Sequence, residues 1–83
     1  MPIKVEKKDG RLEDFDRNKV SGSVVKSGAS PEKAESIATQ IETWAQSAAM
    51  DGVIKSSDIK TKVLELLRSV NPEAAASFET YKK

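Results

Sequence analysis

Residues 3–20 read IKVEKKDGRLEDFDRNKV, the pattern of a hairpin that leads into a helix. Apolar and charged residues alternate at its start, which is the two-residue period of a strand. Asp9-Gly10 then supplies two residues that tolerate positive φ, a strong hairpin signal. Asp16 is a candidate N-cap, because its carboxylate can accept hydrogen bonds from the free N–H groups of the next turn. We therefore expect a two-stranded hairpin over residues 3–14, followed by a helix from residue 17.

The composition limits what the rest of the chain can be. Its 83 residues suffice for one domain, which we place at 1–83, and a hydrophobic content of 37% predicts a modest core. Without cysteine or histidine there is no disulfide framework, and a metal site would have only oxygen ligands. The net charge of +1 provides no strongly basic body for nucleic acid, so we expect nucleic acid to be an unlikely partner.

Targeting signals are also absent from the sequence pattern. No apolar run approaches the length of a bilayer span, and Met1-Pro2 leads straight into charged, alternating sequence rather than a signal peptide. We expect a soluble, cytoplasmic chain with no membrane partner.

Start and stop signals divide the remaining sequence into four helices. Gly28 predicts the end of the first helix near residue 27. The three later helices each have a capping start signal, in order Ser30-Pro31-Glu32, Ser56-Ser57-Asp58 and Asn71-Pro72-Glu73. The predicted helices cover about residues 17–27, 31–49, 57–69 and 72–82. Residues 53–55 are expected to be a short extended or turn segment.

Apolar stripes indicate the buried faces of these helices. The second helix carries a stripe that runs into Met50, with Trp44 at its edge: Ala34, Ile37, Ala38, Ile41, Ala45 and Ala48. The third carries the largest aliphatic residues, and we expect it to form the centre of the core: Ile59, Val63, Leu66, Leu67 and Val70. In the fourth, Phe78 and Tyr81 are expected to face the third. The predicted fold is mainly α with a small β-hairpin (α+β), in which the hairpin covers a four-helix bundle.

Several short motifs occur in a characteristic order along the chain: Lys7-Lys8-Asp9-Gly10, Glu13, Phe15-Asp16, Asn18-Lys19-Val20, Ile54-Lys55-Ser56-Ser57-Asp58-Ile59 and Tyr81. Together they resemble the ATP-cone family, the regulatory nucleotide-binding module at the front of many ribonucleotide reductases and in the bacterial repressor of their genes. The resemblance covers nearly the whole chain. It implies that ATP or dATP, with Mg²⁺ as a possible companion, binds between the hairpin and the first helices.

By matching positions, the resemblance places the nucleotide contacts on Val5, Lys7, Lys8, Glu13, Asp16, Lys19, Val20 and Ser56. The lysine ammonium groups would meet the phosphates, and Ser56 would add a hydroxyl and helix N-terminal N–H groups. Glu13 or Asp16 could accept a hydrogen bond from the adenine amino group, which guanine lacks at that position. One departure is the dibasic pair, which is often Lys-Arg in the family and is Lys-Lys here.

The functional expectation is a non-enzymatic, allosteric adenine-nucleotide sensor. No serine has an identifiable base partner, and there is no histidine or cysteine nucleophile. No reductase barrel follows and no zinc ribbon precedes the motif, so we expect action in trans on a partner protein or as a homo-oligomer. The alternative is a helical protein–protein interaction module that keeps the fold but has lost nucleotide binding.

Simpler roles exist for the same residues. Lys4, Lys7 and Lys8 could be a solvated hairpin edge, where lysine discourages aggregation. Asp16 and Ser56 could act only as helix caps.

Overall fold

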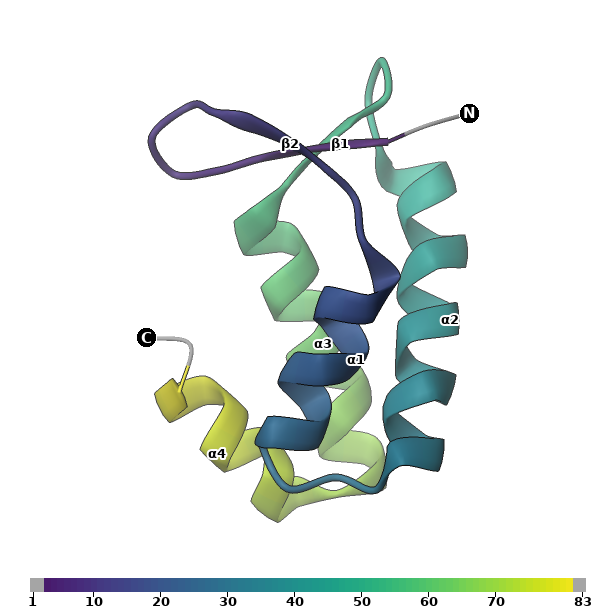
Figure 1. Cartoon of the computed structure of the whole chain (residues 1–83), viewed down its shortest axis with the longest axis vertical. Helices are drawn as coiled ribbons and strands as arrows, with labels where there is room; N and C mark the ends of the chain where they lie inside the picture. The colour runs from purple at the N-terminus through teal and green to yellow at the C-terminus, as the bar shows by residue number, and fades with distance from the viewer. Residues whose placement is uncertain (1–2, 82–83) are drawn as a thin grey trace.

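The computed structural model describes residues 3–81, without the side chain of Tyr81. The predicted inward position of that side chain and the predicted end of the last helix at residue 82 lie outside the described residues. The elements in chain order are β1 (Lys4–Glu6), β2 (Leu12–Asp14), α1 (Arg17–Lys26), α2 (Pro31–Ala48), β3 (Val53–Lys55), α3 (Ser56–Val70) and α4 (Pro72–Tyr81). The fold is therefore mainly helical with a small sheet, and the sheet lies across one end of the helices (Figure 1).

The sheet has three strands, in the order β2-β1-β3, so the predicted two-stranded hairpin was incomplete. β1 pairs with β2 antiparallel and with β3 parallel, with Val5 opposite both Glu13 and Ile54. Sequence alone indicated only an extended or turn segment at β3, because a three-residue strand carries too little alternation to define one. Its pairing depends on a contact between residues about fifty positions apart, which local patterns do not report.

The hairpin turn is one residue longer than a two-residue Asp-Gly turn. The Lys7 N–H donates to the Arg11 carbonyl at 2.8 Å, and Gly10 takes a φ of 88°. Asp9 stays in the normal region of φ, since Asp51 is the single described residue other than glycine with positive φ. A three-residue loop that ends in a left-handed glycine is the next commonest hairpin connection. It places Lys8 at the start of the loop.

Of the caps predicted for the three later helices, two are confirmed and one is wrong. Ser30 accepts from the Lys33 N–H at 3.3 Å, and Asn71 accepts from the Ala74 N–H at 3.1 Å. The helix after β3 begins at Ser56, not 57, and its N-cap residue Lys55 makes no side-chain capping bond. Because β3 continues straight into α3, Ser56 is the first helical residue, and the Ser-Ser-Asp segment lies inside the first turn.

The core has two parts, one between the helices and one beneath the sheet. α2 contributes its predicted stripe from Ala34 to Ala45, with Ile37 and Ile41 almost fully buried, while Leu67 of α3 is also fully buried. α3 is therefore not the single centre of the core. Three predicted core positions are wrong, because Val70 is 43% exposed, Met50, in the α2–β3 turn, is 79% exposed, and Ala48 at the end of α2 is also exposed.

The helices group by contact into α1 with α2 and α3 with α4. α4 is only ten residues long and lies at an angle to α2 and α3 (Figure 1). This arrangement does not by itself establish the regular four-helix bundle that the sequence suggested. Across residues 3–81, no helix combines the length and apolarity needed to cross a membrane.

Candidate functional site

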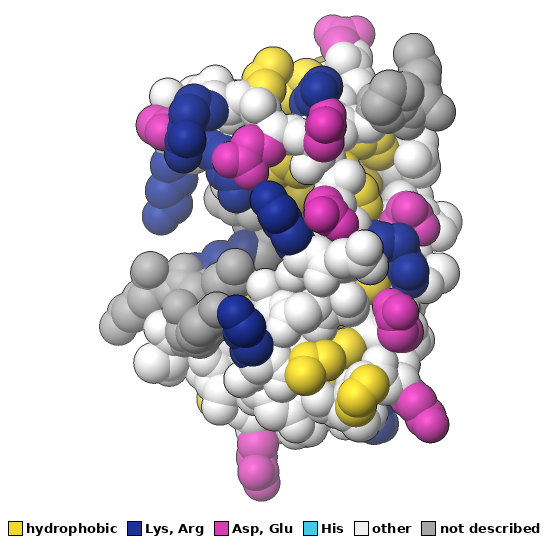
Figure 2. All heavy atoms as spheres, in the orientation of Figure 1, with side chains coloured by type: hydrophobic (Ala, Val, Ile, Leu, Met, Phe, Trp, Pro, Cys, Tyr) yellow, Lys and Arg dark blue, Asp and Glu magenta, His cyan; other side chains and the backbone are white. Residues whose placement is uncertain are grey.

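A cavity of about 590 Å³ lies between the hairpin, α1, α3 and α4. The space-filling view shows the surface hollowed below the hairpin, with basic side chains gathered there (Figure 2). Small-molecule sites commonly enclose about 300–1,000 Å³. The cavity is therefore large enough for a ligand such as a nucleotide.

All eight residues predicted from the sequence line this one cavity. They come from three separate parts of the chain: Val5, Lys7, Lys8, Glu13 and Asp16 from the hairpin and its exit, Lys19 and Val20 from α1, and Ser56 from α3. Nothing in a linear motif requires these segments to meet.

The parallel pairing of β1 with β3 explains how Ser56 reaches the hairpin residues. Glu6 and Lys55 are paired at the ends of these strands, so Lys7 and Ser56 leave the sheet at the same edge. Ser56 then begins α3, where the first N–H groups have no partner within the helix and the helix dipole is positive. A lysine ammonium and a helix N-terminus thus converge on one side of the cavity, which suits an anion.

Glu13 occupies a central position among the charged residues of the cavity. Its Oε1 lies 3.7 Å from Lys7 Nζ and 3.7 Å from Lys19 Nζ. These contacts connect β2 to both the hairpin turn and α1. The predicted phosphate lysines and the predicted base-reading carboxylate are therefore neighbours and not separate groups.

Asp16 combines a structural role with a position in the cavity wall. Its Oδ1 accepts from the Asn18 N–H at 2.9 Å, which confirms the predicted cap of α1. A carboxylate has further acceptor sites on its other oxygen. Asp16 can therefore cap α1 and still accept a hydrogen bond from a ligand.

Sequence reasoning missed most of the far wall of the cavity. The missed lining residues include Ser57, Lys60, Thr61 and Leu64, which are spaced at three and four residues along α3 and so share one face. That spacing is present in the sequence, but the aliphatic stripe on the adjacent face of the helix is the stronger signal and predicts only a core position. Also missed were Asp14, Phe15, Ser23, Ile59, Val63, Phe78 and Glu79.

The apolar part of the cavity wall is continuous with the core. Phe15 and Ile59 line the cavity and pack against both core clusters, and Val63 and Phe78 are buried members of the larger cluster that also line it. The α3 stripe, which we predicted to form the centre of the core, therefore also borders the cavity at Ile59 and Val63. A flat aromatic base could rest on such a surface.

A profile of the ATP cone domain matches residues 3–83. The chain belongs to the ATP-cone family. It is 37% identical over 78 residues to a transcriptional repressor NrdR of Syntrophus aciditrophicus (strain SB), which covers 89% of this chain and 48% of that protein. It is 40% identical over 81 residues to a transcriptional repressor NrdR of Dictyoglomus turgidum (strain DSM 6724 / Z-1310), covering 93% of this chain and 53% of that protein. The chain spans about half the length of these curated relatives.

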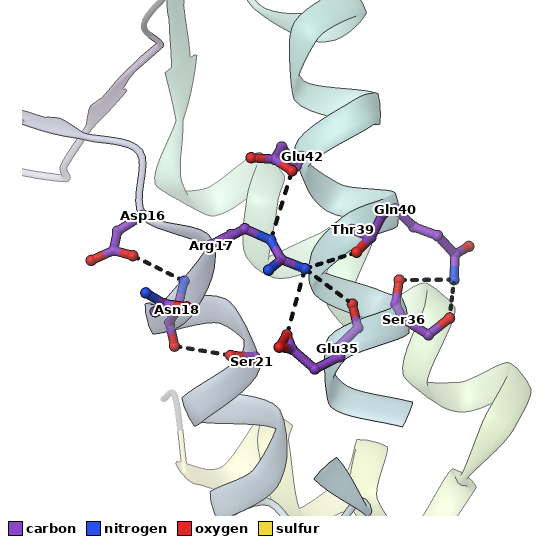
Figure 3. Close-up of polar contacts among 9 residues, drawn as sticks. All are labelled: Asp16, Arg17, Asn18, Ser21, Glu35, Ser36, Thr39, Gln40 and Glu42. Carbon is purple, nitrogen blue, oxygen red and sulfur yellow. Dashed lines mark hydrogen bonds and ion pairs between the residues drawn. The ribbon is translucent and has the colours of Figure 1, made fainter. Parts of the chain in front are cut away.

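Arg17 fixes the start of α1 in this ATP-cone, directly beside the cavity residue Asp16. Its Nη2 donates to Thr39 Oγ1 at 2.8 Å, and the guanidinium lies 3.5 Å from the carboxylate of Glu35 and 3.7 Å from that of Glu42. Figure 3 shows Arg17 reaching to α2 while Asp16 turns toward Asn18. Because a planar guanidinium can contact several acceptors at once, Arg17 ties the first turn of α1 to the middle of α2.

The charges that line this cavity are balanced. Four lysines (Lys7, Lys8, Lys19 and Lys60) face four carboxylates (Glu13, Asp14, Asp16 and Glu79). Asp14 pairs with Lys4. The Lys4 ammonium group donates a hydrogen bond to the Asp14 carboxylate and attracts its negative charge, and both effects lower the pKa of Asp14 below its ordinary value. Among residues 3–81 there is no group of three or more acidic side chains placed to hold a metal ion.

Proposed function

We propose that this ATP-cone binds ATP or dATP in the cavity between the hairpin, α1, α3 and α4 and acts as an allosteric nucleotide sensor rather than as an enzyme. The observation that carries the proposal is the convergence of all eight family-matched residues on one cavity of about 590 Å³. The phosphates would lie near Lys7, Lys8 and Lys19 and the first turn of α3. The adenine would lie against the apolar wall, within reach of Glu13 or Asp16.

The chemistry of the lining residues fits such a ligand. A triphosphate brings several negative charges, and ammonium groups together with a helix N-terminus are the usual protein partners of phosphate. Acceptor-only carboxylates favour adenine over guanine, because the guanine keto oxygen would face another acceptor. Mg²⁺ would enter with the triphosphate.

The effect of binding would pass to a partner through α4. Phe78 and Glu79 of α4 form part of the cavity wall, so a ligand that fills the cavity would also set the packing of α4. Most of the other described α4 side chains are exposed, which leaves this helix accessible to a partner protein or a second copy. The relatives named transcriptional repressors are also regulators, which agrees with a sensing role.

Thermal unfolding with added nucleotide tests the binding proposal. A ligand that binds only the folded state stabilises it by about 2.7 kcal/mol when present at 100 times its Kd. We expect ATP and dATP to raise the Tm of the wild-type chain and GTP to raise it less. Lys7→Glu should abolish the shift, whereas Lys33→Glu, an exposed charge reversal outside the cavity, should keep it. A Tm that does not move at millimolar ATP, with and without Mg²⁺, would overturn the proposal.

The balanced charge of the cavity favours one second candidate, a protein-interaction module that no longer binds nucleotide. Four carboxylates among the lining residues oppose the four lysines and weaken their attraction for phosphate. In that case the partner bound by the wild-type chain would still be bound after Lys7→Glu and Lys19→Glu. If nucleotide sensing is correct, those variants should uncouple partner binding from ATP.

Because the relatives are named transcriptional repressors, duplex DNA is a further ligand to test. Titration with duplex DNA at low salt should give no saturable complex.

A further inference from the structure

The ion pairs of Glu13 suggest how the cavity selects its ligand, an inference that rests on the proposed function. One carboxylate oxygen lies 3.7 Å from the ammonium groups of both Lys7 and Lys19. The side chains of Glu13 and Lys7 are only 36% and 40% exposed, so solvent screens that pair incompletely. A phosphate that approaches these two lysines has to displace the carboxylate or share them with it.

We infer that Glu13 is a specificity-determining residue. Its carboxylate competes with phosphate for Lys7 and Lys19, and only an adenine base provides a hydrogen bond that offsets the loss of those ion pairs. A bare polyphosphate leaves the displaced carboxylate beside a like charge, which is unfavourable. An adenine nucleotide provides an amino group that donates a hydrogen bond to the same carboxylate. Guanine presents a keto oxygen there and does not compensate the displacement.

Consequently, phosphate binding and base recognition are coupled through one side chain. Without Glu13 the lysines would bind inorganic polyphosphate or any purine triphosphate. With Glu13 present, the phosphates gain less binding free energy unless the base donates a hydrogen bond to the displaced carboxylate. Selectivity of this kind, in which a built-in unfavourable interaction rejects the wrong ligand, is common at specific binding sites.

Glu13→Gln is the direct test, because it removes the charge at nearly constant shape. Titration calorimetry would measure the Kd of inorganic tripolyphosphate, ATP and GTP for the wild-type chain and the variant. We expect the variant to bind tripolyphosphate about three- to tenfold more tightly, as the loss of two partly screened ion pairs allows. We also expect its preference for ATP over GTP to fall, because glutamine can donate to guanine as well as accept from adenine.

Glu79→Gln is the matched control. Glu79 also lines the cavity, and its carboxylate pairs with Arg68 at 3.8 Å and not with Lys7 or Lys19. Its removal lowers the negative charge of the wall equally but should leave the preference for ATP over GTP unchanged. Glu13→Asp keeps the charge and shortens the reach, and should give an intermediate tripolyphosphate affinity. Comparison of the melting curves of the variants would verify that each one folds.

The failure of this inference differs from the failure of the proposed function. If the wild-type chain binds ATP but Glu13→Gln leaves both the tripolyphosphate affinity and the ATP-to-GTP ratio unchanged, the role of Glu13 is wrong while nucleotide sensing stands. The same conclusion follows if Glu79→Gln and Glu13→Gln change the two quantities equally. If the wild-type chain binds neither ATP nor dATP, both proposals fall.

Discussion

At the scale of single residues, an ion pair between Lys4 and Asp14 joins the two strands of the hairpin. Lys4 and Asp14 are opposite each other in the β1–β2 register, and both side chains are largely exposed. Lys4 lowers the pKa of Asp14, first through a hydrogen bond and then through charge attraction. Stabilisation by an exposed pair is small, and salt reduces it further.

The lowered pKa of Asp14 predicts a pH-dependent contribution to stability. The folded state holds the Asp14 proton less tightly than the unfolded state does, so the pair stabilises the fold above the ordinary aspartate pKa. That contribution is lost as the pH falls through the lower pKa of the folded state. Asp14→Asn should therefore lower the Tm slightly at pH 7 and not at all at strongly acidic pH.

Paired melting curves from pH 7 to pH 2 would measure this difference. Asp51→Asn is the control, because it removes one charge from the α2–β3 turn and introduces another residue that tolerates left-handed backbone. A difference between wild type and Asp14→Asn that persists at pH 2, or that does not shrink in 1 M salt, would contradict the role of the pair.

At the scale of elements, the first turn of α1 serves both helix formation and the cavity. Replacing Asp16 by alanine removes the cap and the carboxylate together, and loss of such a cap costs about 1 kcal/mol. Asp16→Asn keeps a capping oxygen, so it should retain most of the stability. Any effect of Asp16→Asn on the preference for ATP over GTP then reports the carboxylate alone.

Chemical denaturation of the two variants would separate these contributions. We expect Asp16→Ala to lower the free energy of unfolding and Asp16→Asn to leave it nearly unchanged. Equal destabilisation by both would show that the charge near the helix N-terminus, and not the hydrogen bond to Asn18, supports α1.

The same elements show how far the sequence could be interpreted. Local signals were sufficient for the caps at Asp16, Ser30 and Asn71, because a helix start depends on a few adjacent residues. They were insufficient for β3, whose existence depends on pairing with β1, and for the start of α3, which follows from β3. For the cavity, the family motif marked the hairpin residues, Lys19 and Val20 of α1, and Ser56 at the start of α3, while the rest of the α3 wall and the α4 wall follow from tertiary packing.

At the scale of the whole molecule, stability depends on a small core to which α2 contributes more buried residues than any other helix, while α3 and α4 contribute most of the remaining buried helical residues. Leu67 is fully buried, whereas Val70, on the same predicted stripe, is 43% exposed. The stripe turns away from the core at its end because the chain leaves α3 at Asn71 and enters α4. The two positions therefore allow a buried residue to be compared with an exposed residue of the same predicted apolar stripe.

Leu67→Ala should lower the free energy of unfolding by about 2–5 kcal/mol, the usual cost of removing a buried leucine side chain. Val70→Ala, its matched control, should change it by no more than about 0.5 kcal/mol, as expected at an exposed position. Urea denaturation would measure both values. Comparable losses would mean that Val70 is buried in solution, and that α3 continues to pack after Leu67.

Leu67 and the cavity can then be treated as independent parts of one cooperative unit. Leu67 does not line the cavity, so ATP should raise the Tm of Leu67→Ala through the same gain in folding free energy that it gives the wild-type chain. A much smaller gain in the variant would mean that loss of core packing disturbs the cavity. In that case the coupling would pass through Val63 and Phe78, because these residues belong both to the core cluster of Leu67 and to the cavity wall. Measuring the Kd of ATP for the wild-type chain and for Leu67→Ala would decide whether the core and the cavity are independent, since independence requires equal affinities.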